Sequence, residues 1–276
     1  MRILMFGDVV GRSGRDALCA RLPELRERLK ADFVVVNGEN AAGGYGITGK
    51  ICADLYGAGA DVVTTGNHVW DQRETVGYID GDPRLLRPEN FPKGTPGRGV
   101  ARFETTQGRS VLVVHVMLRL FMDPLDDPFA CVDAALARHT LGGSVDAILV
   151  DTHGEATSEK QAFAYHFDGR VSAVVGTHTH VPTADWRVLP QGTGYISDLG
   201  MCGDYQSVIG MRHEGSVWRF TRKLPNERLK PAEGEATLCA VLIETDDATG
   251  RTKRIEPLRL GGCLAEHWPS GAGDGP

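Results

Sequence analysis

No stretch of this chain constrains its fold more than residues 171–180, where the apolar run Val171–Val175 is followed directly by Gly-Thr-His-Thr-His. A short apolar run that stops at a glycine is typical of a buried strand that ends in a loop. Open α/β sheets bind ligands at the carboxyl ends of their strands, so His178 and His180 can both face one ligand there. Neutral imidazole is a common ligand of divalent transition metals. Taken alone, the pair fits an ordinary loop equally well, with one histidine capping the turn and the other solvated.

Apolar runs that end in polar residues recur along the chain and alternate with segments of helical character. The further strand candidates of this kind are Arg2–Phe6, Phe33–Val36, Asp61–Thr65 and Ala147–Val150. The intervening segments predict helices at Arg15–Lys30, Thr48–Gly57, Phe129–Thr140 and Thr157–Phe167. Strand–helix–strand alternation predicts right-handed crossovers between neighbouring parallel strands, and therefore an α/β fold.

Three further local patterns complete the predicted elements. In the first helix, Ser13 and Asp16 resemble a capping box, and Pro23 is expected to kink or split the helix. The runs at 100–105 and 110–116 predict a β-hairpin. After His180 the pattern becomes richer in strand formers. The strands predicted there are Val217–Leu224 and Leu238–Thr245.

Composition and charge narrow the classes of protein that this chain can be. Its 276 residues carry a net charge of −6, which lacks the basic footprint of a protein that binds duplex nucleic acid. The apolar run at 3–6 is too short for a signal peptide, and no run reaches the ~18 apolar residues of a membrane span. The six dispersed cysteines suit reduced thiols in a cytoplasmic enzyme. We expect one domain at 1–269 and a disordered Gly-, Ser- and Pro-rich tail at 270–276.

Five of the strand ends carry side chains that bind metals. They are Asp8, Glu39 with Asn40, Asn67 with His68, His153, and His178 with His180. Each has an ordinary interpretation as a turn or solvated loop residue, but all of them would lie along the same edge of the predicted sheet. Carboxylates, amide oxygens and imidazoles together suit two ions such as manganese, iron or zinc better than magnesium alone. Two such ions, ~3.5–4 Å apart, commonly clamp a phosphate during in-line attack.

The order of these motifs resembles the calcineurin-like metallophosphoesterase superfamily, above all in Gly66-Asn67-His68 and Gly176–His180. Within it, the chain is similar to the YmdB-like bacterial phosphodiesterases, which hydrolyse 2′,3′-cyclic nucleotides. The motifs that carry this closer resemblance span Met1–Gly14, Asn37–Asn40, Gly66–Asp71, His153–Lys160, Gly176–Val181 and Tyr195–Met201. The resemblance extends from Met1 to about Met211.

The resemblance implies mixed β-sheets packed as a sandwich flanked by helices, with the active site at the carboxyl ends of the strands. It also implies a dinuclear phosphodiesterase in which metal-activated hydroxide attacks phosphorus. One ion would be held by Asp8, Glu39, Asn40 and His180. The other would be held by Glu39, Asn67, His153 and His178. His68 would protonate the leaving oxygen or stabilise the transition-state charge. Iron or manganese is the expected metal, with zinc as an alternative.

The chain departs from the wider superfamily at several positions. The usual first motif, Asp-x-His, has no histidine after Asp8, and Asn40 is expected to replace that ligand. The bridging carboxylate is Glu39 rather than aspartate. His115 lies outside the motifs and is expected to be a structural or rim residue. Asp151 is a candidate partner for a ligating imidazole. Trp70 is expected to fill the core rather than stack on a base.

Alternative functions remain open from the residues alone. The same metal site would serve a phosphomonoesterase or protein phosphatase, because loops such as Asp123–Pro128 would select the leaving group. A nucleotide-binding module without chemistry could instead cradle a phosphate at Gly7–Gly14. A regulatory protein could keep the fold and signal through a partner. We expect a small cyclic nucleotide or a cyclic-phosphate RNA end as substrate, and homo-oligomers are compatible with the sequence.

Overall fold

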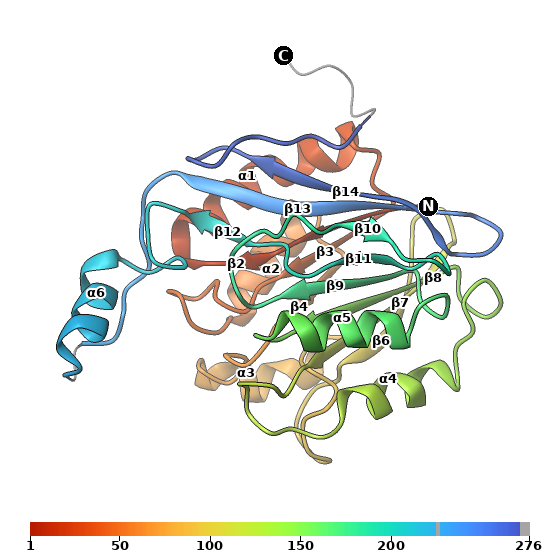
Figure 1. Cartoon of the computed structure of the whole chain (residues 1–276), viewed down its shortest axis with the longest axis horizontal. Coiled ribbons are helices and arrows are strands. Elements are labelled where there is room, and N and C mark those ends of the chain that lie inside the picture. Colours follow the sequence, from red (N-terminus) through yellow and green to blue (C-terminus); the bar gives the residue numbers. More distant parts are fainter. Residues whose placement is uncertain (225–226, 271–276) are drawn as a thin grey trace.

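The computed structural model describes residues 1–224 and 227–270, and these form two β-sheets with helices on their outer faces (Figure 1). The predicted sandwich is therefore confirmed. The tail predicted at 270–276 falls, apart from Ser270, outside the described residues. Among the described helices, none combines the length and apolar character that a membrane crossing requires.

The first sheet has eight strands and is built around parallel strands β1, β3, β4 and β5, as the alternation predicted. Their bounds are Arg2–Phe6, Phe33–Asn37, Val62–Thr64 and Leu85–Leu86. On its other side, β1 pairs antiparallel with β13, and β13 pairs with β14 and β12; β12 in turn pairs with β2. These strands are β13 Ala236–Thr245, β14 Thr252–Leu260, β12 Met201–Asp204 and β2 Asp8–Val9.

The second sheet has six strands in the order β10-β11-β9-β8-β7-β6. Its parallel strands are β7 Ser110–Met117, β8 Ala147–His153, β9 Ala173–Thr177 and β11 Gly194–Ile196. The edge strands are β6 Val100–Glu104 and β10 Arg187–Val188. β6 and β7 form the predicted hairpin.

Alternating side chains along the strands divide the interior into separate cores. Ile3 and Met5 of β1 face the second sheet, where they pack in one cluster with residues such as Val113 and Leu149. Leu4 and Phe6 belong to the cluster on the opposite face, beneath α1 and α2. A third cluster joins the second sheet to α4 and α5. Burial on both faces explains why the central strands read as continuous apolar runs.

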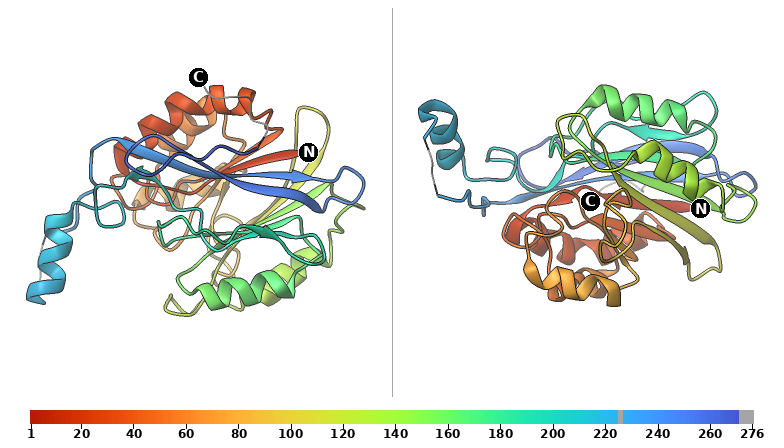
Figure 2. Two further views of the ribbon diagram at one scale, coloured as in Figure 1. Left: turned by 45° about the horizontal axis from the view of Figure 1, so that its top comes forward. Right: turned by 90° about the horizontal axis from the view of Figure 1, so that it is seen from below.

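The helices cover the outer faces of both sheets (Figure 2). The first sheet carries α1 Gly11–Arg28 and α2 Gly49–Ala58, and the second carries α4 Pro128–Leu136 and α5 Thr157–His166. Short α3 Arg73–Tyr78 and η1 Ile79–Gly81 follow β4.

The predicted start of the first helix was wrong, and its proline does not split it. α1 begins at Gly11 with Val10 as N-cap, so Ser13 lies inside the helix and caps nothing. The helix also continues through Pro23 as one element. Leu22 and Leu25, on either side of the proline, are fully buried against the sheet. Their packing outweighs the hydrogen bond that proline removes.

Most of the predicted strand at 217–224 lies instead in helix α6, His213–Arg222, which ends two residues before Leu224. Val217, Phe220 and Leu224 are spaced by three and four residues, a period that also fits a helix, and short apolar runs do not distinguish the two. α6 stands apart from the layered body (Figures 1 and 2), and Trp218 and Phe220 are exposed on it. The prediction failed because, in the part of the chain that the structure describes, no strand pairs with this segment.

Candidate metal centre

The predicted metal-binding side chains gather at one edge of the sandwich. Asp8 follows β1, Glu39 and Asn40 follow β3, and Asn67 and His68 follow β4. The second sheet supplies the remaining three histidines. They are His153, His178 and His180. The two sheets therefore contribute to one site.

His153 lies within β8, not after it as predicted. The strand extends past Val150 because Asp151 and His153 pair with Val175 and Thr177 of β9. As the last residue of a buried strand, His153 is fully inaccessible to solvent. Its imidazole is therefore held more rigidly than a loop residue would be.

Two overlapping groups of ligand atoms form at this edge. Within each, the candidate atoms lie within 4.8 Å of one another. The groups are Glu39 with His153 and His178, and Asp8 with Glu39 and His180. Glu39 belongs to both, which is the position of a carboxylate that bridges two ions.

Both predicted asparagine ligands lie beside these groups. The Nδ2 atom of Asn40 is 3.1 Å from Nε2 of His180. The Oδ1 atom of Asn67 is 3.0 Å from Nε2 of His153. The structure thus brings together all seven residues that were predicted as ligands.

One buried oxygen of the cluster lacks the hydrogen-bond partner that a buried polar atom needs, and two of its imidazole nitrogens lie close together. Oδ1 of Asp8 is buried and accepts no hydrogen bond from any described residue. Nδ1 of His178 and Nε2 of His153 face each other at 3.1 Å. A Cβ on Gly66 would collide with His153 and Glu39, so only glycine leaves these atoms their space. A buried carboxylate oxygen without a partner, close to carboxylate and imidazole ligand atoms, is what a divalent cation requires, and the residues fit one.

The imidazoles are oriented by contacts on their far sides. Nδ1 of His153 lies 2.9 Å from Oγ1 of Thr177, which donates to Asp151. Nδ1 of His180 lies 2.8 Å from the carbonyl oxygen of Ile209. A proton on that nitrogen leaves the Nε2 lone pair of His180 free to bind a metal.

The surroundings raise the pKa values of Asp8 and His153 and lower the pKa of His178. Burial raises the pKa of Asp8 to about 6, against the attraction of His180 and His153. Burial would lower the pKa of His153, but the carboxylates of Glu39 and Asp8 raise it to about 9. Burial and the charge on His153 lower the pKa of His178 to about 3. His178 is therefore neutral, the state in which imidazole binds metals.

His68 belongs to neither ligand group and lies at the rim. Its side chain is 33% exposed, and its Nδ1 is 3.3 Å from a carboxylate oxygen of Asp71. Its backbone N–H donates to Glu39 at 2.8 Å. The ring meets Tyr45 edge-on, with the centroids 5.2 Å apart. His68 thus lies beside the candidate ligands and lines the cavity that opens over them.

The remaining singled-out residues take structural positions. His115 is fully buried, with Nδ1 3.3 Å from Asp151, so it is not a rim residue. Asp151 is linked to His153, a candidate ligand, through the hydroxyl of Thr177. Trp70 packs edge-on against Phe91 and partly fills the core, as expected.

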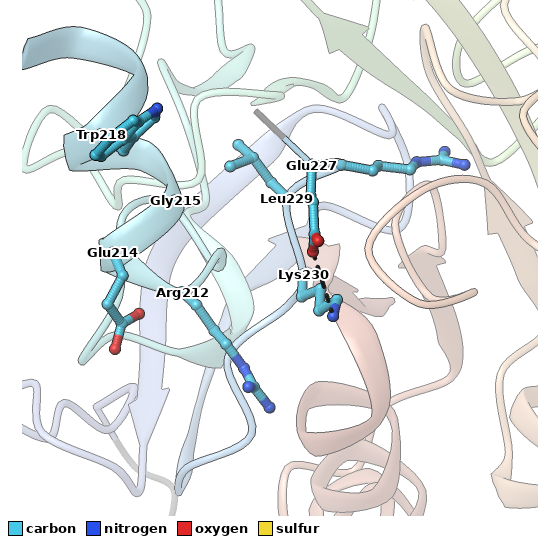
Figure 3. Close-up of a pocket in the computed structure, with 8 residues that line it drawn as sticks. Arg212, Glu214, Gly215, Trp218, Glu227, Leu229 and Lys230 are labelled. Carbon is cyan, nitrogen blue, oxygen red and sulfur yellow. Dashed lines mark ion pairs between the residues drawn. The ribbon is translucent and has the colours of Figure 1, made fainter. Parts of the chain in front are cut away.

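A cavity of about 350 Å³ opens over the cluster. Besides the ligands it is lined by Tyr45, Arg219 and Phe220, none of which sequence reasoning singled out. The latter two lie on α6, whose segment was predicted as a strand. A larger cavity, of about 470 Å³, lies beside it between α6 and residues 227–230 (Figure 3).

Known proteins resemble this chain over most of its length. Residues 4–258 match the family model of the YmdB-like protein. A 2′,3′-cyclic-nucleotide 2′-phosphodiesterase of Bacillus subtilis (strain 168) is 48% identical over 260 residues, which cover 94% of this chain and 97% of the relative.

Solved structures agree with the sequence match. The crystal structure of a hypothetical protein from Thermus thermophilus superimposes with a TM-score of 0.89 at 42% identity, covering 95% of this chain and 100% of the other. A novel phosphatase from Mycoplasma pneumoniae gives a TM-score of 0.86 at 32% identity, covering 95% and 93%. The chain therefore belongs to the YmdB-like protein family.

Proposed function

We propose that this protein is a dinuclear metal-dependent phosphodiesterase that hydrolyses 2′,3′-cyclic nucleotides or RNA ends bearing a cyclic phosphate. The observation that carries the proposal is the pair of ligand groups that share Glu39 beneath an open cavity. The activity of the Bacillus subtilis relative supports the choice of substrate.

The donor set defines which residues would hold the cations. Asp8, Glu39, Asn40 and His180 would hold one, and Glu39, Asn67, His153 and His178 the other. Mixed imidazole, carboxylate and amide donors favour iron or manganese, with zinc as the alternative. When bound, such a pair lowers the pKa of a coordinated water and offsets negative charge on the phosphate oxygens.

In this proposal His68 supplies the proton that the leaving group needs. When water adds to phosphorus and the bond to the ribose 2′ oxygen breaks, that oxygen needs a proton. Asp71 engages Nδ1 of His68, so Nε2 is the nitrogen that remains for the leaving oxygen. The ring is held by this contact and by Tyr45 while it stays accessible from the cavity.

The cavity suits a small nucleotide. Its volume of about 350 Å³ lies within the usual range for small-molecule sites. Tyr45 and Phe220 supply aromatic surface for a base, and Arg219 supplies positive charge near the phosphate. A cavity of this size, lined in this way, favours a mononucleotide or a single RNA terminus over a folded protein substrate.

Comparing three esters tests the proposal. Turnover of 2′,3′-cyclic AMP, bis-p-nitrophenyl phosphate and p-nitrophenyl phosphate would be measured on metal-stripped protein and again after Mn²⁺ is added. We expect metal-dependent opening of the cyclic diester to be preferred, with 3′-AMP as product. Preference for the monoester would make the protein a phosphatase. Absence of turnover despite bound metal would favour a non-catalytic regulatory role.

A further inference from the structure

We infer that the buried ion pair between Lys160 and Asp198 is a positioning device for the loop that carries His178 and His180. The hydrogen bonds of the pair go to backbone groups and to one another rather than to a predicted ligand side chain, and neither residue lines the cavity. It instead fixes the backbone on either side of His178. The inference rests on the proposed metal centre, and it gives a role to the two motifs at 153–160 and 195–201, from which only His153 contributes a ligand.

The loop holds both histidines in an unfavourable backbone conformation. His178 has φ 101° and His180 has φ 66°. Residues with a Cβ rarely adopt positive φ, and such conformations persist only where the surroundings over-determine them. The loop thus needs an external restraint if its two imidazoles are to face the centre before a cation binds.

The ion pair supplies that restraint. Nζ of Lys160 donates to the carbonyl oxygen of Thr177 at 2.8 Å and to Oδ2 of Asp198 at 2.9 Å. The same carboxylate oxygen accepts the backbone N–H of Thr179 at 3.0 Å. One buried pair thereby fixes the carbonyl before His178 and the amide after it.

The segment that carries Asp198 is itself fixed against the loop. Oδ1 of Asp198 accepts the N–H of Gly200 at 2.9 Å. The N–H of Leu199 donates to the carbonyl of Gly176 at 2.9 Å. A Cβ on Gly176 would collide with the carbonyl oxygen of Ser197, so the two backbones meet in direct contact. These contacts hold Asp198 in place, so its side chain would not move with the loop at 177–180 if that loop changed conformation.

A contribution to the stability of the fold does not explain why Lys160 and Asp198 are charged residues. Lys160 and Asp198 are each 1% exposed. Desolvating such a pair costs as much as its attraction returns, and apolar residues of similar volume often stabilise a fold equally well. Apolar side chains, however, could not bind the carbonyl of Thr177 and the amide of Thr179. The polar contacts to the loop are what the pair adds.

The test separates loop positioning from general stability. The double variant Lys160→Met/Asp198→Asn leaves no unpaired buried charge. The side-chain oxygen of the new asparagine is then the one acceptor left for the backbone N–H groups of Thr179 and Gly200, which Asp198 binds with two oxygens. We expect it to fold with a metal-free melting temperature close to that of a matched control, Phe167→Leu, which loosens the buried end of the same helix without touching the loop. Manganese affinity, measured by competition with a chelator, should fall about 10- to 100-fold in the double variant only.

The outcomes distinguish this inference from the proposed function. If wild-type protein binds no manganese, the metal centre itself is wrong. If wild type and double variant bind two ions with equal affinity, the positioning role is overturned. Should the double variant fail to fold, Asp198→Glu replaces it, because it keeps both charges of the buried pair while moving the carboxylate by one methylene relative to the N–H of Thr179. Wild-type manganese affinity in that variant would equally overturn the inference.

Discussion

Oε2 of Glu39 lies 3.0 Å from Nε2 of His153, and the two residues come from different sheets. Glu39 follows β3 of the first sheet, whereas His153 ends β8 of the second. The other carboxylate oxygen of Glu39 accepts the N–H of His68 at 2.8 Å. The candidate centre therefore ties the two layers of the sandwich together at their rim.

Metal removal should consequently destabilise the folded chain, because the centre joins its two sheets. Each cation that binds only the folded chain adds about 2.7 kcal/mol when its free concentration is a hundred times its Kd. We expect the melting temperature to fall on treatment with a chelator and to recover when manganese is returned. Differential scanning calorimetry measures this directly. A melting temperature that changes neither with the chelator nor with added manganese would show that the cluster holds no cation.

Replacing His68 with alanine should separate chemistry from metal binding. The imidazole belongs to neither ligand group, so both ions should remain bound. Loss of the proton donor should lower kcat for the cyclic diester by about 10²- to 10⁴-fold. Steady-state kinetics together with metal analysis would check both parts. Unchanged turnover in metal-loaded protein would remove His68 from the chemistry.

Phe220 should contribute to binding rather than to chemistry. Phe220→Ala removes aromatic surface from the cavity over the cluster. Losing a stacking contact should raise KM for 2′,3′-cyclic AMP about tenfold, with kcat retained. Trp218→Ala is the matched control, because Trp218 lies on the same helix but lines the neighbouring cavity (Figure 3). Equal effects of both substitutions would place the base elsewhere.

Asp146 gives a pH-dependent contribution to stability that is independent of the centre. The N–H and hydroxyl of Ser110, together with the guanidinium of Arg109, hold the pKa of Asp146 below its usual value. The contribution is thus present at neutral pH and is lost as pH falls from about 4 through the folded-state pKa. Asp146→Asn should lower the free energy of unfolding by about 1 kcal/mol at pH 7.

Below pH 4 that difference should shrink, because the carboxyl becomes protonated in the wild type as well. Urea denaturation at both pH values measures it. Asp123→Asn, in an exposed loop, serves as the control and should have no effect at either pH. If the loss of unfolding free energy in Asp146→Asn were larger below pH 4 than at pH 7, the stabilising role given to the Asp146 carboxylate would be wrong.

Sequence reasoning predicted the parts of the fold in which local pattern and tertiary environment agree. β1, β3 and β9 are apolar on both faces and end in glycine or polar residues, so both the strands and the side chains after them were predictable. Those strand ends carry most of the candidate ligands.

The features that sequence reasoning missed depend on partners distant in the chain. The two-residue strand β2 exists because Asp8 and Val9 pair with β12, nearly two hundred residues later. Lys160 and Asp198 are separated by 38 positions, and no local pattern pairs them. Among the described residues, no sheet lies beside α6. The spacing of the apolar residues in this segment does not reveal that, because it fits a strand as well as a helix.

The central claim is that hydrolysis requires two cations sharing Glu39. The most direct test is to titrate metal-stripped protein with manganese while following both bound metal and opening of 2′,3′-cyclic AMP to 3′-AMP. We predict that activity reaches its plateau at two bound ions per chain, and that Glu39→Gln weakens both. Full activity with one ion, or in the absence of metal, would contradict the account.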